Sequence, residues 1–188
     1  MRKKIPGGTR MTERLIRALA IGGVLAAAGA GALNAQNGGS TPEWMSVDHD
    51  GKTVMLEVVA GATGANNNWN YNGFASGEKT IVVPVGYTVT LVFKNNDAAM
   101  VHSAGVGQME TTWPPMYTAV TPVFDGAVSA NPTDMVNATK SGATETLEFV
   151  AETAGEYALI CYIPAHALTG MWLGFRVSAD GEVGVETG

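Results

Sequence analysis

The most regular pattern in the chain is an alternation of apolar and polar residues over positions 87–94 (YTVTLVFK). The odd-numbered positions are all apolar or aromatic, whereas most of the even-numbered positions are polar. A period of two places successive side chains on opposite faces of a strand, with one face in the core and the other nearer water, which is typical of antiparallel sheets. The pattern therefore predicts a strand over 87–94 in an antiparallel β domain.

Other short runs rich in β-branched and aromatic residues have the same character. They are residues 53–59, 80–83, 144–150, 155–161 and 171–177. Clusters of Gly and Asn separate the runs, and no convincing helical period occurs among them. Short strands with Gly-rich turns predict an all-β fold, either a β-sandwich or a Greek-key barrel.

A long stretch over 104–140 interrupts this series of strands. It contains Pro114, Pro115, Pro122 and Pro132, and proline cannot donate a hydrogen bond inside a sheet. We therefore expect an insertion of irregular structure here rather than central strands.

The first 35 residues differ from the rest of the chain. Six of the 11 Lys and Arg residues lie in the first seventeen positions, and the next stretch, 18–32 (ALAIGGVLAAAGAGA), is uncharged and small. It is shorter than the roughly 20 residues that span a bilayer. This arrangement predicts a secretory signal peptide over 1–35, cleaved after Ala32 or Ala35. An uncleaved anchor or an amphipathic helix is the alternative.

The predicted signal peptide sets the division of the chain into segments. Residues 36–52 then form a linker and lead-in, because their first part (QNGGSTP, 36–42) is rich in turn-forming residues. The β domain occupies 53–188.

Charge and composition narrow the possible partners and sites. The 188-residue chain has a net charge of −6, but beyond residue 35 there are 5 basic and 16 acidic residues, a balance of −11. This acidity argues against nucleic acid as a partner. The single Cys excludes an intramolecular disulfide and any site built from cysteines alone, and three His are too few for a centre that needs many imidazoles.

The candidate chemistry lies around the single cysteine. Cys161 ends one predicted strand, Met171 begins the next, and His166 lies midway, with four residues between it and each of them. A tight loop between strands can direct all three side chains at one centre, and a second imidazole is available from His102. Each residue alone has an ordinary structural explanation, since a lone Cys or His is commonly a buried packing residue.

Two imidazoles, one thiolate and a weak thioether form the ligand set of a blue-copper electron-transfer site. Soft sulfur ligands favour Cu(I), whereas imidazoles accept both oxidation states. A rigid compromise between the two preferences changes little when an electron is transferred. The sequence therefore predicts one copper ion and no catalytic residues.

Several motifs resemble those of the cupredoxins, and within them the sulfocyanin and rusticyanin-like group. They are WNYNG (69–73), VPVG (83–86), FKNN (93–96), VHS (101–103) and the segment 161–172. They are spread over most of 53–179, and 104–140 matches no motif. The resemblance implies a Greek-key β-sandwich and one type 1 copper that shuttles electrons outside the cytoplasm. It also implies His102, Cys161 and His166 as strong ligands, with Met171 as the axial one.

Some neighbouring residues have two interpretations. Ser103 either bonds near Cys161 and ties two loops together, or is an ordinary residue at a strand end. The apolar residues around His166 either form a patch for electron exchange, with the imidazole edge at its centre, or simply pack the loop; they are Pro164, Ala165, Ala167 and Leu168.

Residues farther from the cysteine include the four tryptophans and His49. We expect Trp44, Trp69 and Trp172 in the core, while Trp113 could cover the copper loop. His49, between Asp48 and Asp50, is expected in a surface turn rather than in a second metal site.

Three classes of function remain to be separated. An electron carrier is expected, with no enzymatic activity. A copper enzyme subunit is disfavoured because oxidase and reductase sites need more His, and a binuclear copper centre needs a second Cys. A copper chaperone or storage protein is the alternative, although the Met residues are scattered rather than clustered.

The expected carrier would act outside the cytoplasm. We expect an exported monomer, periplasmic or extracellular, or membrane-associated if residues 1–35 are not cleaved. No membrane span is expected in the mature domain. The expected partners are redox proteins such as a cytochrome or an oxidase.

Overall fold

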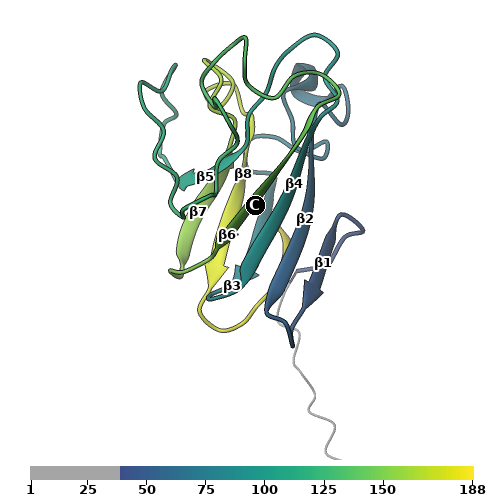
Figure 1. The fold of residues 1–188 in the computed structure, drawn as a ribbon, viewed down its shortest axis with the longest axis vertical. Helices are drawn as coiled ribbons and strands as arrows, with labels where there is room; N and C mark the ends of the chain where they lie inside the picture. Colours follow the sequence, from purple (N-terminus) through teal and green to yellow (C-terminus); the bar gives the residue numbers. More distant parts are fainter. Residues whose placement is uncertain (1–38) are drawn as a thin grey trace, which may run out of the picture. The chain divides into compact units, whose positions relative to one another are not determined.

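The computed structural model describes residues 39–188, and within them the regular structure consists of strands and a single 3₁₀ turn, joined by turns and loops (Figure 1). The strands are β1 (Met45–Asp48), β2 (Thr53–Ala60), β3 (Lys79–Pro84), β4 (Thr88–Asn95), β5 (Gly105–Gln108), β6 (Thr144–Val150), β7 (Gly155–Ile160), β8 (Trp172–Ser178) and β9 (Gly184–Thr187). A 3₁₀ turn, η1 (Ala65–Asn68), lies between β2 and β3.

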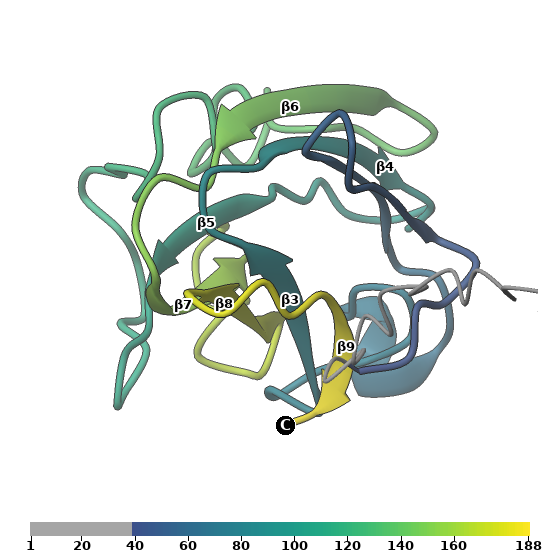
Figure 2. The same ribbon diagram turned by 90° about the horizontal axis from the view of Figure 1, so that it is seen from below.

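The strands form two sheets that pack face to face. One sheet has the order β1-β2-β4-β6 and the other β5-β7-β8-β3-β9; Figure 2 shows the two layers from the end. Buried apolar side chains of both sheets meet between them, as in other sandwiches. Examples are Leu56, Leu91 and Phe149 from the first sheet and Ile81, Leu159 and Phe175 from the second.

All six predicted runs are strands in the structure, and the predicted faces are correct. Along β4 the burial alternates strictly, with Val89, Leu91 and Phe93 fully buried and their neighbours partly exposed. The all-β Greek-key sandwich expected from the sequence is therefore confirmed.

The expectation of an antiparallel β domain is correct for most strand pairs but not for all of them. β2 pairs with β4 in parallel, and β3 pairs with β8 in parallel, whereas the other neighbours are antiparallel. The chain crosses from β2 to β3 in the opposite sheet and returns as β4, so β2 and β4 become neighbours that run the same way. Alternating polarity reports that one face is buried, and that is equally true of a strand in a mixed sheet.

Three strands have no clear signal in the sequence. β1 lies in the segment assigned to the linker and lead-in, β5 lies at the start of the 104–140 stretch, and β9 follows the last predicted run. β5 is an edge strand that pairs with β7, and an isolated bridge joins its Gly105 to Val128. The remainder of 104–140 contains no other strand, so the expectation of irregular structure without central strands is correct for most of it.

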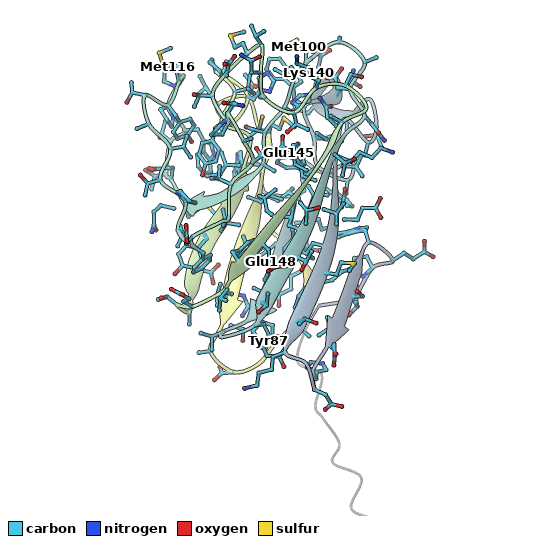
Figure 3. All side chains as sticks on the ribbon, in the orientation of Figure 1. Tyr87, Met100, Met116, Lys140, Glu145 and Glu148 are labelled. Carbon is cyan, nitrogen blue, oxygen red and sulfur yellow. The ribbon has the colours of Figure 1, made fainter. Side chains whose placement is uncertain are left out.

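The residues proposed to bind copper lie at one end of this sandwich. His102 lies between β4 and β5, and the other three lie in the connection from β7 to β8. In Figure 3, Met100 and Met116 are at one end of the strands and Tyr87 is at the opposite end. Because His102 follows Met100 by two residues, the candidate site is at the end where the long loops gather.

The predicted signal peptide, 1–35, with its cleavage positions, lies outside the described residues. Within 39–188, the structure has no helix with the length and apolar character needed to cross a bilayer.

Candidate metal centre

Three donor atoms from two separate parts of the chain meet in the interior. The side chains of His102, Cys161 and His166 are buried, and their donor atoms all lie within 4.8 Å of one another. The two Nδ1 atoms are 3.2 Å apart, and the Cys161 Sγ is 3.9 Å from Nδ1 of His102 and 3.4 Å from Nδ1 of His166.

Backbone hydrogen bonds close the loop that carries Cys161 and His166. The Cys161 N–H donates to the Met171 carbonyl (3.1 Å), the Met171 N–H donates to the His166 carbonyl (2.8 Å), and the His166 N–H donates to the Ile163 carbonyl (3.0 Å). The evenly spaced Cys161, His166 and Met171 therefore lie in a compact loop whose backbone path is fixed by these hydrogen bonds. Met171 is fully buried beside the other two residues.

His102, which follows β4 of the first sheet, is held in place by hydrogen bonds. Its backbone exchanges two hydrogen bonds with Thr139, at 3.1 and 3.0 Å. The Nδ2 of Asn95, the last residue of β4, donates to the carbonyls of Met100 (2.8 Å) and Thr139 (2.9 Å). The 104–140 stretch is therefore bonded both to the end of β4 and to His102 itself.

A buried carboxylate that sequence analysis missed orients the His102 ring. Asp97 accepts a hydrogen bond from Nε2 of His102 (2.9 Å) and another from the Ala99 N–H (2.9 Å). Burial alone would raise the pKa of Asp97, but these hydrogen bonds and the neighbouring imidazole hold it below its usual value. An ionised Asp97 fixes the proton on Nε2, so Nδ1 is left free for a metal.

Ser103 ties the two ligand-bearing segments together, as one interpretation of the sequence predicts. Its N–H donates to the Cys161 Sγ at 3.5 Å, and its hydroxyl accepts from the Tyr162 N–H at 2.9 Å. The buried Tyr71 hydroxyl donates to the Ser103 carbonyl at 2.5 Å, which joins a third segment to the same point.

The surroundings of His166 differ from the expectation of an exposed imidazole edge. Only 1% of His166 is exposed, and Ala167 is buried, whereas Leu168 is 48% exposed. Trp69, expected in the core, is half-buried and stacks on the His166 ring with a centroid distance of 4.0 Å and an interplanar angle of 22°. Its separation from His166 in the sequence gave no signal of this contact.

The 104–140 stretch covers another side of the loop. Trp113 packs on Trp172, with ring centroids 5.1 Å apart, in a cluster that includes Ala167. The Ala165 N–H also donates to the Pro115 carbonyl at 2.8 Å. The possibility that Trp113 covers the loop is therefore correct.

His49 is not part of this group. It is exposed in the turn between β1 and β2, and its Nδ1 lies 3.2 Å from the Tyr87 hydroxyl. Among the described residues, the three converging donors form the one such group, so the second metal site disfavoured by the sequence gains no support.

Burial controls the protonation of the donors in the metal-free protein. It raises the pKa of the Cys161 thiol, although hydrogen bonds from Ser103 act in the opposite direction. It lowers the pKa of His166 to about 4, with a further contribution from the charge of His102. The pKa of His102 is also lowered by burial, against the opposing effect of Asp97. Near neutral pH the imidazoles are therefore unprotonated donors, and a metal ion must displace the thiol proton.

The three donors fit a single metal ion of the expected kind. With metal–nitrogen distances of about 2.0 Å and a metal–sulfur distance of about 2.3 Å, donors in a trigonal arrangement lie roughly 3.4–3.8 Å apart. The observed separations are 3.2, 3.4 and 3.9 Å. One thiolate and two imidazoles in a dry interior are the donor set of type 1 copper, in agreement with the cofactor expected from the sequence.

Comparison with known proteins assigns the family. The Sulfocyanin (SoxE) domain matches residues 40–186. The chain belongs to this domain family. The resemblance to the sulfocyanin and rusticyanin-like cupredoxins is therefore confirmed, and the matched region begins before β1, so it includes that strand.

Individual relatives are similar over most of the described region. Sulfocyanin from Sulfolobus acidocaldarius is 34% identical over 125 residues, which cover 64% of this chain and 61% of that protein. Rusticyanin from Acidithiobacillus ferrooxidans is 33% identical over 131 residues, or 68% of this chain and 64% of the relative. The chain thus spans less than two thirds of the length of these curated relatives.

The solved structures that this chain matches include a rusticyanin and an auracyanin. Reduced rusticyanin, determined by NMR, has a TM-score of 0.49 and 25% identity, and the match covers 72% of this chain and 86% of that one. Reduced auracyanin from Roseiflexus castenholzii has a TM-score of 0.46 and 26% identity, over 71% of this chain and 99% of that one.

The hydrogen bond between Asp97 and His102 leads to a prediction about metal affinity. Asp97→Asn keeps the shape but removes the charge, and an amide does not fix the imidazole tautomer as a carboxylate does. Loss of such a partner typically weakens metal binding by about 10–100-fold. Competition with a Cu(I) chelator measures this change. Asp125→Asn, at an exposed position, is the control, and equal affinities for the two variants would contradict the role assigned to Asp97.

The lowered pKa of His166 predicts acid sensitivity of the metal-free protein. Its pKa is about 4 in the folded chain against 6.5 ordinarily, so between these values the unfolded chain binds more protons. Stability that is present above pH 6.5 is then lost as the pH falls toward 4. Urea unfolding at several pH values measures the slope. We expect a shallower slope for His166→Gln than for the wild type; equal slopes for the two proteins would contradict the assignment.

Proposed function

We propose that this protein is a mononuclear type 1 copper protein that carries single electrons between redox partners outside the cytoplasm. The observation that carries the proposal is the buried group formed by His102, Cys161 and His166. When bound there, a copper ion supplies a one-electron couple between Cu(II) and Cu(I).

The chain's own contribution is to hold the donors still. Donors free to move would rearrange toward the geometry that each oxidation state prefers, and this rearrangement would slow electron transfer. The closed loop around Cys161, the tie through Ser103 and the Asp97 bond to His102 oppose such movement. All three donors are also packed away from water, which strengthens electrostatic interactions at the site.

We assign Met171 to the axial position. Its backbone is bonded to both Cys161 and His166, and its side chain is fully buried at the same loop. A weak thioether ligand is typical of blue-copper sites and favours the reduced ion. This assignment rests on the backbone placement, on the burial and on the resemblance to the family.

Burial of the donors argues against the other functions. A copper enzyme needs an opening through which a substrate reaches the metal, yet His102, Cys161 and His166 are each 1% exposed or less. A copper chaperone or storage protein must exchange its metal readily, which is easier from exposed and mobile ligands. The electron carrier needs neither property, and we propose that the protein is not an enzyme.

The cellular context of the proposal comes from the sequence. A signal peptide over 1–35 would export the chain to the periplasm or the cell exterior, or leave it membrane-associated if it is not removed. The exported domain would act as a monomer and would exchange electrons with redox proteins such as a cytochrome or an oxidase. Its charge of about −11 disfavours binding to the negatively charged backbone of nucleic acid.

Substitution of the thiolate tests the proposal directly. In Cys161→Ser the hydroxyl cannot replace the copper–thiolate bond, so we expect complete loss of the intense visible absorption while the far-ultraviolet circular dichroism remains that of a β protein. His49→Ala, which changes an exposed His outside the group, serves as the control and should keep the full absorption. A wild-type protein without intense colour when loaded with Cu(II) would refute the proposed function.

Substitution of the thioether tests the axial assignment. In Met171→Gln an amide oxygen replaces sulfur, and this harder donor favours Cu(II) over Cu(I). The reduction potential should fall by at least the roughly 59 mV that corresponds to a tenfold change in a one-electron equilibrium. Potentiometric titration measures it. Met135→Gln is the control because Met135 is exposed, and an equal potential in the two variants would remove Met171 from the ligand set.

A further inference from the structure

The route from the metal centre to the surface is not through an open His166 edge. His166 is 1% exposed, and the ring of His102 lies beside it with centroids 5.0 Å apart. Ala167 and Trp113, which are buried and pack in one cluster, lie on another side of the loop that carries His166. A partner that touches this end of the protein would therefore meet other side chains before it reached the imidazole.

Trp69 is the aromatic side chain between that imidazole and the solvent. It stacks nearly parallel on the His166 ring, at 4.0 Å and 22°, and it remains partly exposed. One face of the indole therefore contacts a metal-binding ring while part of the same side chain reaches the surface. Stacked aromatic pairs also add to the packing energy of the rings, so this contact restrains His166.

The backbone around Trp69 is built for this position. Asn66, Asn67 and Asn68 all have positive φ, at 48°, 56° and 67°, a conformation that is uncommon for residues other than Gly. The Asn66 Nδ2 donates to the Trp69 carbonyl (2.8 Å) and to the Thr169 carbonyl (3.0 Å). The Asn66 amide thus joins the Trp69 segment to the loop that carries His166. The residues with positive φ lie at this same connection.

The segments that form this contact contain no charged residue, although the domain is acidic. Residues 61–77, 98–109, 111–124 and 157–175 contain no Asp, Glu, Lys or Arg, whereas the chain after residue 35 has 16 acidic and 5 basic residues. They include the loop with Trp69 and the loop from Cys161 to Met171, whereas Lys140, labelled near Met100 in Figure 3, belongs to the neighbouring segment 125–143. A partner that docks here must match an apolar and neutral surface.

We propose that Trp69 positions His166 and is the contact through which the metal centre exchanges electrons with a redox protein that presents an uncharged apolar surface. The proposal rests on the proposed function. In the transfer, one electron passes from the reduced cofactor of the partner to the copper ion. The partner is oxidised by one electron, Cu(II) becomes Cu(I), and no bond is made or broken.

The main experiment compares electron exchange in copper-loaded variants. Trp69→Leu removes the ring, Trp69→Phe keeps one, and Trp44→Leu changes a partly buried Trp that packs elsewhere on the core. The rate of self-exchange between oxidised and reduced protein is measured by NMR line broadening, with the reduction potential determined for each variant. We expect Trp69→Leu to be slower by at least about tenfold, equivalent to about 1.4 kcal/mol of barrier, and the other two to stay near wild type.

A second measurement, the NMR chemical shift of the His166 ring protons in the metal-free protein, tests whether Trp69 positions His166. The stacked indole should shift the His166 ring protons upfield, and this shift should vanish in Trp69→Leu but persist in Trp44→Leu. In the loaded protein, Trp69→Leu should release copper to a chelator about fivefold faster, the change that corresponds to one lost aromatic contact.

A surface variant tests the contact without altering Trp69. Asn67→Asp adds a negative charge at an exposed position two residues from Trp69, and Asp tolerates positive φ. Thr53→Asp adds the same charge at an exposed position in β2. Because charge repulsion acts most strongly where two copies touch, Asn67→Asp should slow self-exchange more, and salt should restore it.

The outcomes separate this inference from the proposed function. A coloured wild type in which Trp69→Leu and Asn67→Asp exchange electrons as fast as their controls would overturn the inference and leave the function intact. Equal slowing by Trp69→Leu and Trp44→Leu would overturn it as well. A wild type that forms no coloured copper site would instead refute the proposed function.

Discussion

The structure depends on a hydrogen-bonded junction at Ser103 between its two sheets. His102 follows β4 of one sheet, and Cys161 follows β7 of the other, so the donors would be independent without a link at this end. Ser103 provides the link, because its hydroxyl accepts from the Tyr162 backbone and its own N–H faces the Cys161 sulfur. The spacing of the donors is thereby set by the sandwich as a whole, and any loss of packing between the sheets would change it.

The second constraint is the removal of water from polar groups. Neutral imidazoles can be buried at moderate cost, but an ionised carboxylate such as Asp97 needs compensation. It receives hydrogen bonds from a backbone N–H and from Nε2 of His102. The arrangement keeps a negative charge close to the centre without an accessible counter-ion. That charge stabilises the higher positive charge of an oxidised metal, so the same residue that orients a donor also affects the balance between oxidation states.

Sequence analysis predicted the elements whose signal is local. The alternation in 87–94 reports a buried face, and the spacing of Cys161, His166 and Met171 reports a loop between two strands, so both could be read from neighbouring residues. The parallel pairing of β2 with β4 could not, because it follows from the crossing of the chain between sheets. Asp97 lies only five residues before His102, but nothing distinguishes its carboxylate from the other acidic residues of the chain. Trp69 and His166 are far apart in the sequence and meet only in three dimensions.

The burial of Met171 has a consequence for the chemical durability of the protein. Thioethers are oxidised to sulfoxides when a peroxide reaches them, and a sulfoxide is a larger and polar group. Met55, Met109, Met116 and Met135 are 39–59% exposed, whereas Met171 has no exposed surface. An oxidant in solution therefore meets these outer sulfur atoms first, and the folded sandwich shields the one thioether whose alteration would disturb the interior of the loop. The exposed methionines would therefore be oxidised before the buried thioether of Met171.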